Sequence, residues 1–135
     1  MISIRKISGE RAAPLDRTCF PADVPIDPRR GVWWGAFDDD GLCAFAGAVT
    51  WRPDDCLYLS RCGVLERARG QGLQRRLIRA RLRHASAMGL TGAYTYTLND
   101  NPTSANNLIA CGFRLWWPAR PWGNKRAVYF YREIR

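Results

Sequence analysis

The chain has 135 residues, of which 47% are hydrophobic and 24% are charged, and it carries a formal net charge of +9. This composition is typical of a globular protein and excludes a disordered or fibrous chain. The length suits one domain, so we expect residues 1–135 to form a single domain with a sizeable core.

Membrane and metal-binding classes are disfavoured by the same sequence. No run approaches the roughly 20 apolar residues of a membrane-spanning helix, and the N-terminal residues lack the apolar segment of a signal peptide. We therefore expect a cytoplasmic protein with no membrane partner. The five cysteines contain no Cys-x-x-Cys pair, which predicts reduced, mostly buried thiols, no metal site and no disulfide framework.

Arginine dominates the positive charge. Nineteen of the 21 basic residues are arginine, and seven of them lie between positions 67 and 83. Such a basic surface raises the hypothesis of a nucleic-acid partner. No helix-turn-helix or zinc-finger signature accompanies the arginines, so we expect a local anion site and not a nucleic-acid interface.

The first half of the chain predicts four strands and one helix. Isoleucines at positions 2, 4 and 7 suggest a first strand, and an irregular helical stretch follows over residues 9–20 until prolines break it. Apolar runs at 32–37 and 42–51 flank an Asp-Asp-Asp-Gly turn and predict a hairpin. Residues 57–64 predict a fourth strand. We expect the tryptophans on strands to lie in the core.

The second half begins with a long helix. Leu73, Leu77, Ile78 and Leu82 recur at helical spacing, and Gly89 is placed to end the helix. Arg81 falls on the same apolar face, where a buried guanidinium needs a carboxylate or a route to water. The remaining segments predict a strand at 93–98, a short helix at 103–110 and two strands at 113–117 and 127–134.

Strands and helices in this order predict an α/β fold, with a mixed sheet of about seven strands and three to four helices on its faces. The fourth strand, the long helix and the fifth strand form a strand-helix-strand unit. These two strands should therefore be parallel neighbours, and ligands bind at the ends of such strands.

The turn before the long helix, residues 67–72, reads Arg-Ala-Arg-Gly-Gln-Gly. Amides in the first turn of a helix lack internal partners, and the helix dipole adds a partial positive charge there. Glycines let phosphate oxygens approach these amides. The turn therefore predicts a pyrophosphate site, with a tight turn under a surface arginine cluster as the alternative. Neither a Walker loop nor a dinucleotide-binding loop fits, because both require residues that this turn lacks.

Two motifs resemble the GNAT acyltransferase superfamily. Residues 64–73, Val-Leu-Glu-Arg-Ala-Arg-Gly-Gln-Gly-Leu, resemble its acetyl-CoA signature, and Asn101-Pro102 followed by Gly112-Phe113 resembles its closing motif. Together they cover about residues 56–113 in the family's order and separation. The resemblance implies a GNAT-like fold in which the fourth and fifth strands splay apart at a bulge.

The resemblance also implies acetyl-CoA as cosubstrate, an amine as acceptor and no metal. The pantetheine arm is expected near Cys62 and the pyrophosphate over residues 69–74. The implied cofactor-binding residues are Cys62, Gly63, Val64, Arg67, Arg69, Gly70, Gln71, Gly72, Leu73, Gln74, Asn101 and Ser104. Without the resemblance, Asn101 would be an ordinary turn residue and Ser104 a solvated hydroxyl.

Both positions that commonly carry protons in the family depart from its pattern. The tyrosine that protonates the leaving thiolate is expected seven residues after the asparagine, where this chain has Leu108, and a glutamate base five residues before it is replaced by Tyr96. We assign Tyr96 as the candidate catalytic residue, which could orient a water or donate its proton. Plain strand packing is the alternative. Asp54 and Asp55 are further candidate bases, although a polar turn explains them better.

The predicted function is transfer of an acetyl group from acetyl-CoA to a primary amine of a small molecule or peptide. A catalytically weak or inactive acyl-CoA-binding module of the same fold is the alternative, because of Leu108 and Tyr96. The resemblance implies that the acceptor site is bordered by Trp122, in the loop before the last strand, and by residues 23–27. Exposed strand edges would allow a homodimer.

Overall fold

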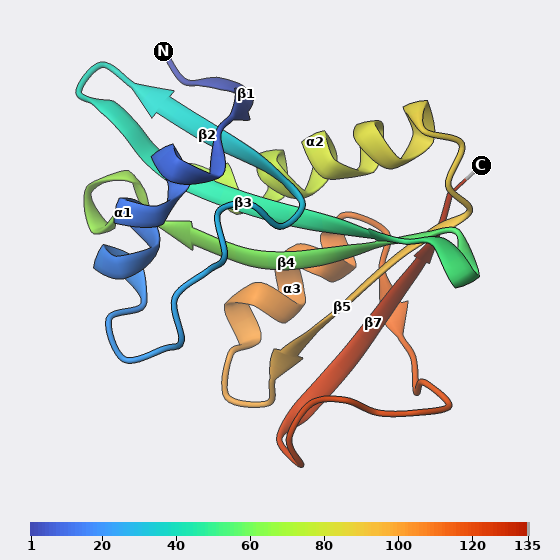
Figure 1. The fold of residues 1–135 in the computed structure, drawn as a ribbon. Coiled ribbons are helices and arrows are strands. Elements are labelled where there is room, and N and C mark those ends of the chain that lie inside the picture. The colour runs from blue at the N-terminus through green and yellow to red at the C-terminus, as the bar shows by residue number, and fades with distance from the viewer. Residues whose placement is uncertain (135) are drawn as a thin grey trace.

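The computed structural model describes residues 1–134, apart from the side chain of Arg52. In chain order the elements (Figure 1) are β1 (Ser3–Ile7), α1 (Gly9–Cys19), β2 (Val32–Asp38), β3 (Gly41–Trp51), η1 (Arg52–Asp54), β4 (Cys56–Val64), η2 (Glu66–Ala68), α2 (Leu73–Ala87), β5 (Gly92–Leu98), α3 (Pro102–Ala110), β6 (Arg114–Leu115) and β7 (Ala127–Glu133). The strands form one sheet in the order β1-β2-β3-β4-β5-β7-β6. The predicted α/β fold with a mixed seven-stranded sheet is confirmed.

The sheet has two arms that meet at one parallel pair. Strands β1 to β4 pair antiparallel with their chain neighbours, and β5, β7 and β6 form a second antiparallel group. Only β4 and β5 are parallel, because α2 carries the chain back between them. The predicted strand-helix-strand unit is therefore present.

Strands β4 and β5 pair over only three residues each. The register Cys56↔Gly92, Leu57↔Ala93 and Tyr58↔Tyr94 ends there, and beyond it the strands diverge toward the left of Figure 1. One side-chain contact bridges the start of the gap, where Thr95 Oγ1 donates to Leu59 O at 2.7 Å. The splay leaves the carboxyl halves of both strands open toward each other.

A bulge in β4 lies at the start of the splay. Its register with β3 shifts between Ala46↔Cys62 and Ala48↔Leu59, so two residues of β4 face Gly47 alone. Such an extra residue bends a strand and increases its twist. The bend turns the second half of β4 away from β5.

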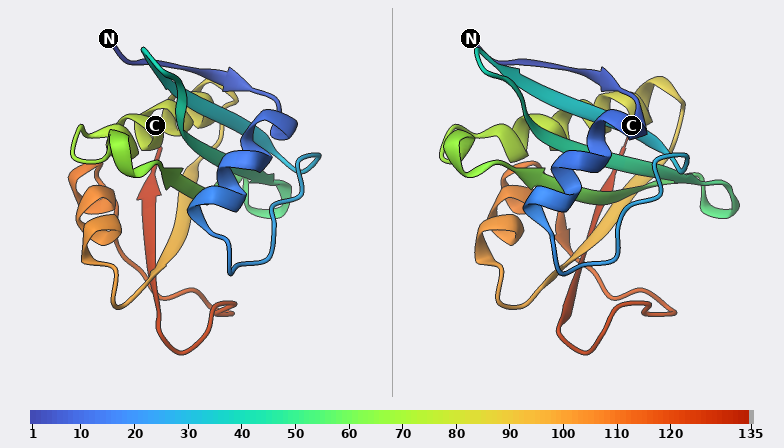
Figure 2. Two further views of the ribbon diagram at one scale, coloured as in Figure 1. Left: turned by 90° about the vertical axis from the view of Figure 1, so that its left-hand side faces the viewer. Right: turned by 60° about the vertical axis from the view of Figure 1, so that its left-hand side comes forward.

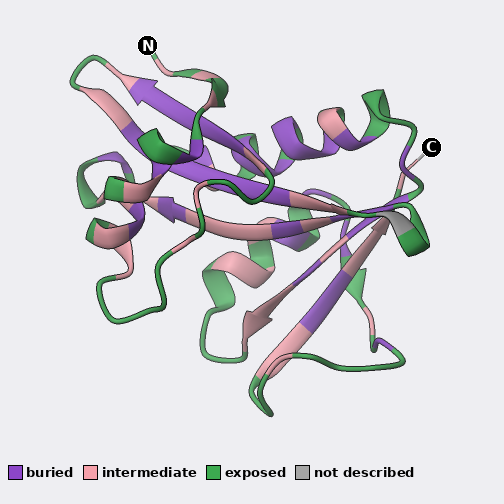
Figure 3. Ribbon diagram, viewed as in Figure 1, coloured by how far each residue is buried: buried purple, intermediate pink, exposed green. Residues whose placement is uncertain are grey.

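Helices cover both faces of the sheet (Figure 2). Helix α1 packs Ala12 on one face, against Trp33 and Phe45. On the other face, the apolar stripe of α2, with Leu77 and Ile78 at its centre, joins the larger core. The buried residues run along β2, β3 and the inner side of α2 (Figure 3). No helix within residues 1–134 is both long and apolar enough to cross a membrane.

The last hairpin departs most from the sequence prediction. The strand expected at 113–117 is only the two residues of β6, because Pro118 restricts the backbone of Trp117 and has no N–H to pair. Trp33 and Trp34 are buried as expected, but Trp51 and Trp117 are exposed. Trp51 is the last residue of β3, and Trp117 lies beyond the end of β6, so the prediction that strand tryptophans lie in the core was wrong for both.

Candidate functional site

The glycine-rich turn ends directly at the first residue of α2. Gly70 and Gly72 have φ angles of +79° and +74°, a region that other residues enter at a cost. An added Cβ at either position would meet no atom within 4 Å. Backbone conformation and open space, and not crowding, therefore explain these glycines.

The backbone amides at this turn are available to a ligand. Within the described chain, the amides of residues 70–75 donate to no backbone carbonyl, and Gly72 has no side-chain cap. The helix dipole points its positive end at the same place. Together these amides form an anion site of the type that binds phosphates.

A groove of about 700 Å³ runs from this turn along the open edge of β4. Ten of the sequence-predicted cofactor residues line it: Cys62, Gly63, Val64, Arg69, Gly70, Gly72, Leu73, Gln74, Asn101 and Ser104. Its walls also include Cys19 and Phe20 from the end of α1, and Asn107 from α3. Sequence reasoning missed these residues because nothing local indicates that α1 and α3 flank the same groove.

Arg67 and Gln71 belong to the predicted set but do not line the groove. Gln71 is exposed on the turn. Arg67 turns away toward the β2–β3 hairpin, where its Nη2 lies 3.1 Å from Asp38 Oδ1 and its Nε 3.3 Å from Asp38 Oδ2. This hydrogen bond holds the pKa of the Asp38 carboxyl below its usual value.

A hydrogen-bonded chain of side chains joins α2 to α3 along one wall of the groove. Gln74 Nε2 donates to Ser104 Oγ at 3.1 Å, and Asn107 Nδ2 donates to Gln74 Oε1 at 2.7 Å. Arg75 Nε then donates to Asn107 Oδ1 at 2.8 Å. Asn101 caps α3, since its Oδ1 accepts from the Ser104 amide at 3.2 Å. These contacts fix one wall of the groove.

A smaller cavity of about 160 Å³ fills the fork between β4 and β5. It shares Cys62, Gln74, Asn101 and Ser104 with the groove. Leu108, which is 4% exposed, lines it from α3. We call this space the fork cavity.

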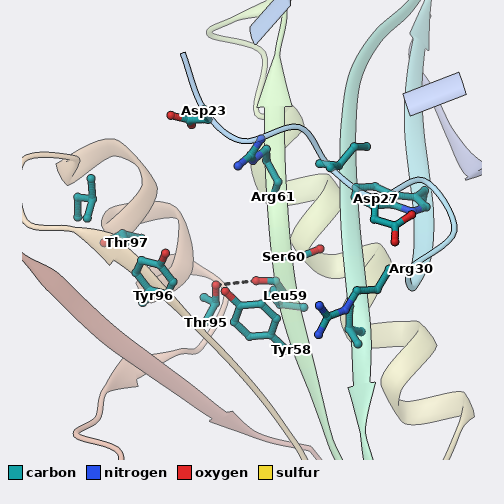
Figure 4. Close-up of a pocket in the computed structure, with 14 residues that line it drawn as sticks. Asp23, Asp27, Arg30, Tyr58, Leu59, Ser60, Arg61, Thr95, Tyr96 and Thr97 are labelled. Carbon is teal, nitrogen blue, oxygen red and sulfur yellow. Dashed lines mark hydrogen bonds between the residues drawn. The ribbon is translucent and has the colours of Figure 1, made fainter. Parts of the chain in front are cut away.

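A third cavity of about 450 Å³ opens on the opposite side of the fork (Figure 4). It shares with the fork cavity the residues Leu59, Ser60, Arg61, Thr95, Tyr96 and Thr97. Asp23 and Asp27 border it from the segment between α1 and β2, and Arg30 and Tyr58 lie opposite Tyr96 (Figure 4). We call this space the outer cavity.

Three buried polar atoms with no partner in residues 1–134 belong to residues that line the outer cavity. They are Trp33 Nε1, Ser60 Oγ and Thr97 Oγ1. A buried polar group without a hydrogen bond is costly. Their gathering at one cavity is therefore consistent with a polar ligand there.

An ion pair anchors the segment that closes the outer cavity. Arg61 Nη1 donates to Asp16 Oδ1 at 2.8 Å and to Val24 O at 2.9 Å, and Asp16 Oδ2 accepts from the Ile26 amide at 3.1 Å. Asp16 is fully buried in α1. Its position on the apolar stripe, four residues after Ala12, was the sequence signal that could have revealed it.

Tyr96 lines both the fork cavity and the outer cavity, so the structure brings the predicted catalytic residue to the site. Its ring also packs on Trp122, with centroids 6.1 Å apart. Trp122 itself lines a separate aromatic cavity of about 680 Å³, which adjoins the outer cavity at Arg30, Val49 and Tyr58.

The neighbouring tyrosines are poor bases. Burial raises the pKa of Tyr58 and raises that of Tyr94 to about 12. Asp54 and Asp55 lie in the turn at the paired end of β4, where Asp54 Oδ1 accepts from the Cys56 amide at 3.1 Å. The described residues contain no group of three or more His, Cys, Asp or Glu side chains that could hold a metal ion.

Solved structures of similar fold are acetyltransferases. An "IAA acetyltransferase" from Bacillus cereus is 16% identical with a TM-score of 0.82, over 99% of this chain and 100% of that one. A ribosomal-protein alanine N-acetyltransferase from Escherichia coli is 16% identical with a TM-score of 0.78, over 99% and 94%.

A phosphinothricin acetyltransferase from Sinorhizobium meliloti, solved in complex with AcCoA, is 16% identical with a TM-score of 0.76, over 98% of this chain and 88% of that one. At these identities, the likeness establishes the fold. No curated protein matches the chain at a significant level. The model of the acetyltransferase (GNAT) family matches residues 6–113. Since that match spans most of the sequence, the chain belongs to the GNAT acetyltransferase family.

Proposed function

We propose that this protein is an acetyl-CoA-dependent N-acetyltransferase that acts on a primary amine of a small molecule or peptide. The observation that carries the proposal is a continuous row of three spaces. The groove shares four lining residues with the fork cavity, and the fork cavity shares six with the outer cavity. A donor in the groove and an acceptor in the outer cavity would meet in the fork.

The residues of the groove suit coenzyme A. The free amides of the glycine turn face the place for a pyrophosphate, with the Arg69 and Arg75 side chains beside them. The open edge of β4 around Cys62 offers backbone groups to the amides of the pantetheine arm. Acetyl-CoA, when bound, supplies an activated acyl group as a thioester.

The outer cavity suits an amine. Asp23 and Asp27 provide negative charge at its border, and the Arg29 amide bound to Asp27 Oδ1 lowers the pKa of that carboxyl, so it stays ionised. A cationic amine would meet these carboxylates beside Arg30, which lines the same cavity, and would lose a proton to solvent before it reacts. The alanine N-acetyltransferase and the phosphinothricin acetyltransferase, which have the same fold, are named for acceptors that carry an amine.

A matched pair of glycine variants tests the cofactor site. Gly72 and Gly89 lie at opposite ends of α2 with φ angles of +74° and +72°, and neither has an atom within 4 Å of an added Cβ. Alanine should therefore destabilise the fold similarly at both positions, by roughly 1–2 kcal/mol. Only Gly72→Ala should weaken CoA binding, by about tenfold or more, because the methyl group obstructs the anion site.

Calorimetric titration of CoA into wild type, Gly72→Ala and Gly89→Ala measures the difference. Equal affinities in all three, or no binding to wild type, would reject the proposed cofactor site.

An acyl-CoA-binding module without turnover is the second candidate function. It is favoured by buried, apolar Leu108, which gives the fork cavity no proton donor from α3. Release of free CoA thiol from acetyl-CoA across a panel of primary amines decides between the two. Amine-dependent release rejects the module, and tight CoA binding with no release above the amine-free rate supports it.

A further inference from the structure

Arg81 is a buried cation without a carboxylate partner among the described residues. It is 2% exposed, and none of the ion pairs in residues 1–134 includes it. Its guanidinium donates only to carbonyls: Nε to Leu77 O at 3.1 Å, and Nη1 to Gly47 O at 3.1 Å and Ser60 O at 3.5 Å. The sequence predicted a carboxylate partner or a route to water for this guanidinium, and the structure supplies neutral acceptors instead.

The carbonyls of Gly47 and Ser60 lie at the bulge, where the ladder between β3 and β4 is interrupted. Arg81 therefore holds the bulge that begins the splay. Carbonyl groups satisfy hydrogen-bond donors, but they do not neutralise a full positive charge. Burial lowers the pKa of Arg81, yet an arginine in a protein remains protonated near neutral pH.

The charge of Arg81 reaches the fork cavity, which the residue lines. The other cation on that cavity, Arg61, is paired with Asp16 at 2.8 Å, and none of the lining residues is a carboxylate. The remaining titratable groups there are Tyr96 on β5 and Cys62 on β4. An unpaired positive charge in a narrow space with no carboxylate on its wall favours an anion.

The positive charge of Arg81 affects the thiol of Cys62 on the cavity wall. Burial raises the pKa of Cys62, and Arg81 opposes that rise by favouring the thiolate. A second thiol in the fork cavity would be subject to the same attraction, with less burial cost where the cavity opens to the groove.

Given the proposed function, on which this inference rests, we propose that Arg81 stabilises the thiolate that leaves when coenzyme A gives up its acyl group. In that step the amine nitrogen forms a bond to the acyl carbon, the carbon–sulfur bond breaks, and sulfur takes the electron pair. The amine proton passes to water in the outer cavity, and a solvent proton later returns to sulfur. Arg81 donates no proton, so Leu108 need not be replaced by another acid.

The test is the pKa of the CoA thiol in its binary complex with the protein. Ultraviolet absorbance of the thiolate is followed against pH, and the complex with desulfo-CoA is subtracted to remove the chain's own cysteines. In wild type the bound thiol should titrate about one to three pH units below free CoA, as expected for a neighbouring opposite charge. An unshifted or raised thiol pKa in wild type, with CoA bound, would overturn the inference and leave the proposed function standing.

Variants separate the charge from the structural contacts. Arg81→Gln should return the thiol pKa to that of free CoA or above, whereas Arg81→Lys should keep a lowered value even if lost carbonyl contacts reduce its melting temperature. Arg83→Gln, on the exposed side of the same helix, is the matched control and should behave as wild type. A thiol pKa in Arg81→Lys equal to that of free CoA would contradict a role for the charge.

The acyl group is the other source of an anion, if it carries a carboxylate. Calorimetry with acetyl-CoA and succinyl-CoA distinguishes the two sources, and we expect wild type to bind them within about twofold of each other. Preferential binding of succinyl-CoA that Arg81→Gln abolishes would assign the guanidinium to the acyl chain and reject the thiolate. Absence of CoA binding in wild type would instead reject the proposed function itself.

Discussion

Single charged residues decide how the site is held together. Asp16, buried in α1, accepts from the Arg61 side chain and from the Ile26 amide, so one carboxylate ties together α1, β4 and the segment that borders the outer cavity. Removing it would leave the Arg61 charge without a carboxylate at the edge of the outer cavity, which is destabilising. Arg81 has no such carboxylate partner among the described residues, so its charge stays available to an anionic ligand.

The half-buried side chain of His84 is predicted to make the stability of the fold depend on pH. Its ring packs edge-on against Trp34 with centroids 5.2 Å apart, and its buried Nε2 has no partner within the described chain. Burial, and then the charge of Lys6, lower the pKa of His84 below the ordinary value of 6.5. The unfolded state therefore binds a proton more readily, and stability must fall as pH drops through about 6.5.

We expect the melting temperature of wild type to fall more steeply between about pH 7.5 and 5.5 than that of His84→Gln, which cannot titrate there. Lys6→Gln removes the smaller cause and should reduce the slope only in part. Equal slopes in wild type and His84→Gln would contradict the prediction.

At the scale of elements, the sequence predicted the order of helices and strands better than the contacts between elements that are distant along the chain. The helical spacing of residues 73–82 and the alternation of strands and turns gave every strand of the sheet and the parallel pair, because these signals are local. Ten of the twelve predicted cofactor residues line one groove. Eight of them follow in order along β4, the glycine turn and the first turn of α2, whereas Asn101 and Ser104 join them from the start of α3. Arg67 does not line the groove because its side chain donates to the carboxylate of Asp38, which is distant in sequence.

The contacts that sequence could not predict join elements that are far apart along the chain. The link between Gln74 and Asn107, the capture of Arg81 by the Gly47 carbonyl and the approach of α1 to the groove all depend on packing. The conformation of the loop before β7 could not be predicted for a further reason. Its prolines and tryptophans do not recur at the spacing of a helix or a strand, so the sequence indicates neither its path nor its aromatic contacts.

Trp122, in the loop before β7, is predicted to affect which amines the protein accepts. Trp122 is 44% exposed and lies 4.8 Å from Tyr129, 5.6 Å from Tyr94 and 6.1 Å from Tyr58, measured between ring centroids. It lines the aromatic cavity beside the outer cavity. Trp122→Ala should therefore lower kcat/KM for phenethylamine more than for ethylamine, while the CoA dissociation constant stays unchanged.

Trp117→Ala is the matched control, because Trp117 also packs on Tyr129, at 5.4 Å, but is 71% exposed and does not line the aromatic cavity. If both variants lose the same preference for the aromatic amine, Trp122 has no special part in acceptor choice.

At the scale of the whole molecule, a ligand bound in the groove would contact the elements on both of its walls and so stabilise the fold. The two arms of the sheet share only three residue pairs between β4 and β5, and the groove is walled by β4 on one side and by α2 and α3 on the other. Some of the arginines near the groove are hydrogen-bonded to protein groups, namely Arg67, Arg75 and Arg81. A local anion site, and not a nucleic-acid interface, stays the prediction for the net charge of +9.

Binding of CoA should raise stability in proportion to its affinity. At about 100 times the dissociation constant, the gain is roughly 2.7 kcal/mol, which corresponds to a rise of several degrees in melting temperature. High salt should reduce the gain, because the Arg69 and Arg75 charges near the groove are exposed and screened. Differential scanning fluorimetry with CoA checks this, and a gain independent of salt would argue against phosphate recognition.

The splay also creates a hazard of self-association. Beyond Tyr58 and Tyr94, the facing edges of β4 and β5 have no strand between them, and unpaired edges can template the addition of a strand from another chain. A cofactor arm laid along β4 occupies that edge as a strand would. Under the proposed function, the bound cofactor would then also protect the protein from aggregation, so that depletion of the cofactor would lower its solubility.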